Sequence, residues 1–170
     1  METQAIQHAP AEAADAEAIV EPHAGEGTGV RQACAVLPGR LLQGARILPQ
    51  RNALLRLLPT DGVFVEVGVA LGDFSARILK QCRPRRFIAI DIFTIHESPA
   101  IWGKPTAEIF GGRSHEQFYR DRFAGPIAEG RVEVLSGDSL DSLERLDDAS
   151  ADVIYLDADH SYEAVSKELE

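Results

Sequence analysis

The stretch that decides the fold covers residues 62–82 and reads GVFVEVGVALGDFSARILKQC. Its first part, residues 62–68, is a β-branched apolar run that predicts a buried strand. Its last part, residues 72–82, predicts a helix with Phe74 and Ile78 on one face. A strand that leads directly into a helix is the unit from which parallel sheets are built.

The same unit recurs toward the end of the sequence. Apolar runs at residues 85–91, 131–138 and 151–159 predict three further strands, and helices are predicted at residues 114–123, at 139–146 and after Ser161. Ahead of the first strand, a short helix is expected over residues 49–58, with Leu54, Leu55, Leu57 and Leu58 toward a core. Residues 92–112, rich in Gly and Pro, are expected to be irregular. The alternation predicts an α/β fold with a doubly wound parallel sheet covered on both faces.

The first 42 residues differ in composition from the rest. They are rich in Ala, Glu, Gly and Pro and poor in large apolar side chains. Such a segment buries too little surface to offset the entropy of ordering, so a disordered tail is predicted over residues 1–42, ahead of a domain over residues 43–170. Residues 1–30 hold six acids and no Lys or Arg, and so contribute −6 to the net charge of −10.

Composition and charge exclude several kinds of partner. No basic stripe is present, which argues against nucleic acid, and no apolar run approaches the roughly 20 residues of a membrane span. No secretory signal is visible, which favours the cytoplasm. Cys34 and Cys82 match no metal-ligand spacing and are predicted to be free thiols. An acidic site would suit a cationic small molecule.

Carboxylates follow all four predicted strands. Glu66, Asp91, Asp138 and Asp157 lie at or near the four strand ends. Because the carboxyl ends of parallel strands share one edge of the sheet, the four acids are expected to line one crevice. The alternative, that each acid only caps a following helix, stays open for any single residue.

The loop after the first strand carries Gly68 and Gly72, a G-x-x-x-G spacing. A dinucleotide-binding loop would have the G-x-G-x-x-G spacing, which brings the backbone close to a pyrophosphate. The observed spacing therefore disfavours a dehydrogenase.

Four motifs, taken in order, resemble the class I S-adenosylmethionine-dependent methyltransferases: VEVGVALGDFSARI (65–78), FIAIDIF (87–93), LSGDS (135–139) and IYLDADHSYEAV (154–165). The resemblance is closest to the small-molecule and sugar O-methyltransferases with a DGDHSYE-type motif. It implies a Rossmann-like fold that binds S-adenosylmethionine. Glu66, Gly68 and Gly72 would cradle the methionine end, Asp91 would accept hydrogen bonds from the ribose, and Asp138 with Ser139 would face the adenine.

The resemblance also suggests roles for the last motif. Asp157 would bind a divalent cation such as Mg²⁺, and Asp159 or His160 would be the general base that activates a hydroxyl of a small-molecule acceptor. A metal-free reaction stays open. Capping of the last helix stays open as the role of Asp159 and His160.

The family sheet has seven strands in the order 3-2-1-4-5-7-6, and these residues offer the first four. We therefore expect the sequence to be truncated after the fourth strand, as a fragment of a longer protein that alone binds cofactor weakly. Completion of the sheet by another chain, as in a homo-oligomer, and a degenerate remnant of the family are the alternatives. A non-catalytic cofactor-binding module that lacks the acceptor half is the competing function.

Overall fold

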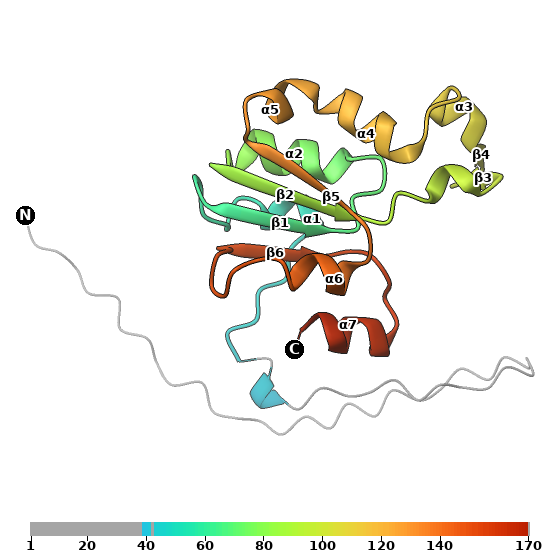
Figure 1. Ribbon diagram of the computed structural model, residues 1–170. Helices are drawn as coiled ribbons and strands as arrows, with labels where there is room; N and C mark the ends of the chain where they lie inside the picture. Colours follow the sequence, from blue (N-terminus) through green and yellow to red (C-terminus); the bar gives the residue numbers. More distant parts are fainter. Residues whose placement is uncertain (1–38, 42, 170) are drawn as a thin grey trace, which may run out of the picture. The chain divides into compact units, whose positions relative to one another are not determined.

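The computed structural model describes residues 39–41 and 43–169 (Figure 1). Gly39–Leu41 form a short 3-10 helix, η1. The rest of the predicted tail, with Cys34, lies outside the described residues. A compact unit begins at Arg46 and contains the sheet and the helices that cover it.

A four-stranded parallel sheet is the centre of this unit. The strands are β1 (Val63–Val67), β2 (Arg86–Asp91), β5 (Val132–Ser136) and β6 (Val153–Leu156), in the order β5-β2-β1-β6. In the register of the sheet, Glu66 of β1 lies opposite Ala89 of β2 and Tyr155 of β6. The predicted α/β, doubly wound fold is confirmed, and the strand order is 3-2-1-4 when the four strands are numbered along the chain.

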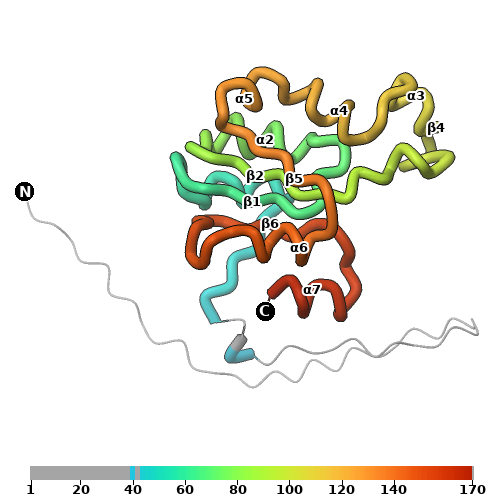
Figure 2. Tube along the Cα trace, in the orientation of Figure 1, coloured from blue at the N-terminus to red at the C-terminus, as the bar shows by residue number. Residues whose placement is uncertain are grey.

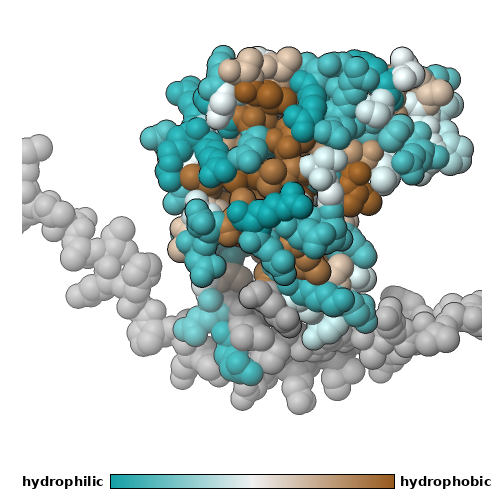
Figure 3. Space-filling model, in the orientation of Figure 1, coloured by the Kyte–Doolittle hydropathy of each residue, from teal (hydrophilic) through white to brown (hydrophobic). Residues whose placement is uncertain are grey.

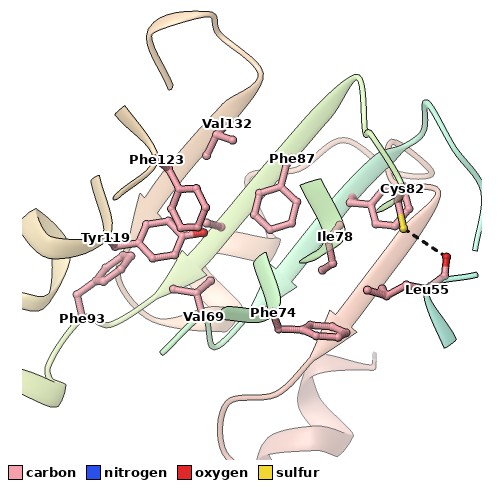
Figure 4. Packing of buried hydrophobic residues seen from close by; sticks show 12 residues of the cluster. Leu55, Val69, Phe74, Ile78, Cys82, Phe87, Phe93, Tyr119, Phe123 and Val132 are labelled. Atoms are coloured by element: carbon pink, nitrogen blue, oxygen red, sulfur yellow. Dashed lines mark hydrogen bonds between the residues drawn. The ribbon is translucent and has the colours of Figure 1, made fainter. Parts of the chain in front are cut away.

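One face of the sheet packs against α2 (Asp73–Gln81), α4 (His115–Arg122) and α5 (Ala124–Ala128). Phe74 and Ile78 of α2 are buried, as the helical spacing predicts. They meet strand residues and the aromatic side chains of the α4–α5 segment in one cluster (Figure 4), where the buried free thiol of Cys82 donates to the carbonyl of Leu55. Tyr119 of α4 and Phe123, four residues further on at the C-cap of α4, both belong to this cluster.

The opposite face packs against α6 (Ser139–Leu143), and α7 (Tyr162–Glu168) lies on that side of the sheet as well (Figure 2). The alternate residues of β1, Val63, Val65 and Val67, contact this second cluster together with Leu143 and Leu146. Both faces of β1 are therefore buried, which accounts for its continuous apolar run.

The prediction of an irregular segment at residues 92–112 is wrong. The segment forms η2 (Ile95–Glu97), a hairpin of β3 (Ala100–Ile101) and β4 (Lys104–Pro105), and α3 (Thr106–Phe110). Trp102 and Gly103 make the two-residue turn, both with positive φ, as tight hairpin turns require. Phe110 anchors the segment because its buried ring packs edge-on against Phe118.

The outer helices are less buried than their patterns predict. α1 covers only Arg51–Leu54; Leu55 after it is buried, while Leu57 is 53% exposed. Tyr162, the first residue of α7, and Leu169, which follows the helix, are also exposed. Apolar surface also shows over the strands and beneath α5 in Figure 3. Among the described residues, no helix has the length and apolar character needed to cross a membrane.

Candidate functional site

A cavity of about 670 Å³ lies where the strands end, within the roughly 300–1,000 Å³ usual for small-ligand sites. Its apolar wall includes Ile90, Ile92, Ile95 and Leu140. Its polar side chains include six acids and one lysine: Asp91, Asp138, Asp157, Asp159, Glu163, Glu168 and Lys167. Three of the four predicted strand-end acids therefore meet in one crevice, and Glu66 does not line it.

Glu66 instead points to the α2 face of the sheet, where it is 1% exposed. Alternation along β1 explains this placement, since Phe64 and Glu66 share one face and the valines the other. The hydroxyl of Ser75 in α2 donates to Glu66 Oε2 at 2.6 Å. Burial raises the pKa of Glu66 to about 8; the Ser75 hydrogen bond opposes this rise, and the charge of Asp157 adds to it.

Asp91 ends β2 and holds the loop after β1. Its Oδ2 accepts hydrogen bonds from the backbone N–H groups of Val69 (2.8 Å) and Ala70 (3.2 Å), and its Oδ1 accepts from Phe93 N–H (2.7 Å). Oδ1 keeps capacity for one further donor, because a carboxylate oxygen accepts about two hydrogen bonds. Asp91 is thus a loop-positioning residue that still presents one acceptor to the cavity.

The loop itself is strained, with positive φ at Gly68, Ala70 and Gly72. The buried side chain of His115 helps to hold it, since Nε2 donates to the carbonyl of Ala70. A Cβ on Gly68 would lie 2.5 Å from the carbonyl oxygen of Asp157, so glycine is required for the approach of two strand ends.

Gly72 has a different surrounding. It lies outside the cavity lining, and a Cβ there would meet the rings of Phe123 and Tyr119. Gly68 lines the cavity, so the structure separates the two glycines that the sequence analysis grouped together.

Asp138 follows β5 and is the N-cap of α6. Its Oδ1 accepts from the N–H groups of Leu140 (2.9 Å) and Asp141 (3.4 Å). Asp138 and Ser139 both line the cavity. Asp138 therefore both caps α6 and lines the cavity.

Asp157, at the end of β6, has a cationic or imidazole partner on each oxygen. Arg51 Nη1 lies 2.8 Å from Oδ2, and His160 Nε2 lies 3.3 Å from Oδ1. No group of three His, Cys, Asp or Glu side chains with the geometry of a metal site occurs in residues 39–41 and 43–169. The metal ion predicted at Asp157 is therefore not supported. Asp157 and its neighbours Arg51 and His160 do not provide the several oxygen ligands of a Mg²⁺ site.

The two candidate bases differ in their surroundings. Asp159 lines the cavity, and its Oδ1 accepts from Ser161 N–H at 2.8 Å, ahead of the helix that Ser161 caps. His160 lies between two lining residues, and its side chain is 74% exposed. Contact of Nε2 with Asp157 favours the tautomer with the proton on that nitrogen, which leaves Nδ1 free to accept one.

Several site residues carry no sequence signal. Arg51 precedes its partner Asp157 by 106 residues, and nothing local to α1 indicates the contact. Ser75 lies within the motif at residues 65–78, but neither its role nor that of His115 is indicated by the sequence. Glu163, Lys167 and Glu168 of α7 also line the cavity, and the sequence assigned them no role.

The chain is an α/β protein with a doubly wound parallel sheet and a cavity of small-ligand size at the carboxyl ends of its strands, the edge at which such folds usually bind ligands. Residues 65–170 match a family described as a methyltransferase domain, which is more than half of the chain. The chain belongs to this family. Comparison with curated proteins finds none that matches it.

Proposed function

We propose that the chain is an S-adenosylmethionine-dependent methyltransferase that acts on an oxygen atom of a small molecule, such as a sugar or another natural product. One observation carries the proposal: Asp91, Asp138 and Asp157 come together from three strands around a cavity of ligand size. The family match supports methyl transfer in general, and the acidic cavity suits a cationic donor.

The cavity has groups that match the chemistry of the cofactor. Asp91 Oδ1 is available to a ribose hydroxyl, and Ile92, Ile95 and Leu140 offer apolar surface to the adenine near Asp138 and Ser139. Gly68 lets the chain approach closely at the β1 end. When bound, S-adenosylmethionine supplies an electrophilic methyl group on a sulfonium sulfur.

The protein's own part in the reaction is to hold the acceptor and remove its proton. We assign the base to His160, whose Nδ1 takes the proton of the acceptor hydroxyl while Asp157 orients the ring through Nε2. Asp159 is the second candidate, but one of its oxygens is already occupied by Ser161 N–H. No step is assigned to a metal ion.

Calorimetric titration with S-adenosylhomocysteine tests the cofactor assignment. The unaltered chain should bind one equivalent, and Asp91→Ala should weaken binding about tenfold or more, because it removes the ribose acceptor and loosens the loop. Glu97→Ala is the matched control, since this exposed acid lies outside the cavity lining. Binding that is unaffected by Asp91→Ala would refute the ribose assignment.

Methyl transfer is tested separately with labelled S-adenosylmethionine and hydroxyl-bearing acceptors. Loss of transfer in His160→Ala, with unchanged cofactor affinity, is the expected result for a base. Binding without any transfer would favour the alternative function, a cofactor-binding module.

A further inference from the structure

The two ends of the cavity differ in charge. At the end formed by the β2 and β5 loops, Ile92, Ile95 and Leu140 are apolar, and the Asp138 carboxylate already accepts two backbone N–H groups. At the end formed by β1 and β6, Asp157 lines the cavity and is paired with Arg51. Only this second end combines an anion with a guanidinium.

Arg51 is held firmly although its side chain is 54% exposed. Its guanidinium carbon lies 4.8 Å from the centre of the Phe74 ring, and Nη1 is 2.8 Å from Asp157 Oδ2 and 3.5 Å from the hydroxyl of Tyr155. Stacking on an aromatic face and pairing with a carboxylate both restrict the rotamers of an arginine.

The guanidinium has donors to spare. Within the described chain, its hydrogen bonds all come from Nη1, so Nη2 and Nε remain available. Arginine presents its donors as a planar fork that matches the two oxygens of a carboxylate. Arg51 is not one of the lining residues, but it adjoins the cavity through Asp157, which is. An exposed, preorganised fork at this margin of the cavity is suited to bind an anionic group of the ligand.

We propose that Arg51 binds the α-carboxylate of S-adenosylmethionine, with Asp157 beside it facing the α-ammonium group. This inference rests on the proposed function. The cofactor has an uncharged planar base, a neutral sugar and a zwitterionic amino-acid end. The apolar end of the cavity matches the base, and the end with both charges matches the zwitterion. Arg51 is thus a binding residue that sets the orientation of the cofactor.

Lys167 is the rival cation, since it lines the cavity from α7. Its amine is a single charge on an exposed, flexible chain, and none of the described ion pairs includes it. The guanidinium of Arg51 is better placed because its pairing with Asp157 fixes it before the ligand arrives.

A protein–ligand double-mutant cycle tests the assignment. S-adenosylhomocysteine and its decarboxylated analogue are titrated into the unaltered full chain, Arg51→Ala, Lys167→Ala and, as matched control for charge in the same segment, Arg56→Ala. The unaltered chain and Arg56→Ala should bind S-adenosylhomocysteine about tenfold or more tightly than the analogue, whereas Arg51→Ala should bind the two alike.

Three results would overturn this inference and leave the proposed function in place. Equal weakening of both ligands in Arg51→Ala would show that Arg51 acts only on the structure of the site. Unchanged affinity for both ligands in Arg51→Ala would show that Arg51 does not contact the carboxylate, and loss of the preference in Lys167→Ala alone would transfer the role to that residue. If the unaltered chain bound neither ligand, the proposed function itself would fail, and this inference with it.

Discussion

The buried carboxyl of Glu66 makes the stability of the protein depend on pH, and Glu66→Gln should remove that dependence. Burial raises the pKa of Glu66 from 4.5 to about 8. At neutral pH the folded chain therefore holds a proton that the unfolded chain has released. Glutamine has nearly the same shape, keeps an oxygen to accept from Ser75, and needs no proton.

The sign and the size of this pH dependence follow from the difference in the pKa of Glu66 between the folded and the unfolded chain. Because the folded pKa lies above the unfolded pKa, the contribution of Glu66 to stability is fully present below about pH 4.5 and is lost as the pH rises through about 8. Each pH unit in this window changes the free energy of unfolding by about 1.4 kcal/mol, so the whole window amounts to at most about 5 kcal/mol. Glu66→Gln should therefore gain stability relative to the unaltered protein as the pH rises.

Urea unfolding at several pH values between 5 and 8 measures the effect. The difference in unfolding free energy between Glu66→Gln and the unaltered chain should be smallest near pH 5 and grow by about 3 kcal/mol or more by pH 8. Glu97→Gln, a change at an exposed acid, is the matched control and should show a flat difference. A flat difference for Glu66→Gln as well would refute the assignment of a buried, protonated carboxyl.

Further substitutions test the loop, the cap and the ion pair, each by urea unfolding. Gly68→Ala should cost about 2–5 kcal/mol, because its φ of 84° is combined with a Cβ 2.5 Å from a carbonyl oxygen. Gly103→Ala, with φ of 75° and open space, should cost only about 1–2 kcal/mol, and equal costs would contradict the close approach. Ser161→Ala should lose about 1 kcal/mol, since its hydroxyl caps α7; no loss would mean that the cap is not formed in solution. Asp157→Asn should change stability by less than about 1 kcal/mol because Arg51 is half exposed, and a loss above about 3 kcal/mol would show a desolvated pair.

The strand-end acids illustrate what the sequence predicts well. Asp91, Asp138 and Asp157 each follow a short apolar run, and parallel strands must bring such positions to one edge. The predicted helix starts at Ser114 and after Ser161 agree with the observed N-caps, where each serine hydroxyl accepts from the N–H group of the third residue along. These features depend on backbone periodicity and short-range hydrogen bonds, which a sequence carries directly.

Other features depend on contacts that the sequence does not encode locally. The apolar run around Glu66 predicts a strand but does not reveal on which face of the sheet the Glu66 side chain lies. In the structure it lies on the face covered by α2, where it contacts Ser75. Arg51 meets Asp157 across 106 residues. The hairpin around Trp102 comes from a segment whose Gly and Pro residues suggest an irregular loop, and its order depends on the packing of Phe110 against the rings of His115 and Phe118 in α4.

The central claim is that S-adenosylmethionine binds in the cavity at the carboxyl edge of the sheet. Amide hydrogen exchange of the full chain, with and without saturating S-adenosylhomocysteine, tests it most directly, because binding slows exchange where it suppresses local opening. Protection should appear at the four strand-end loops, residues 68–70, 92–95, 137–140 and 157–161, and not at the hairpin turn of Trp102 and Gly103. Protection confined to other segments, or no protection at saturating S-adenosylhomocysteine, would contradict the account. Equal protection by NAD at the same concentration would also contradict it.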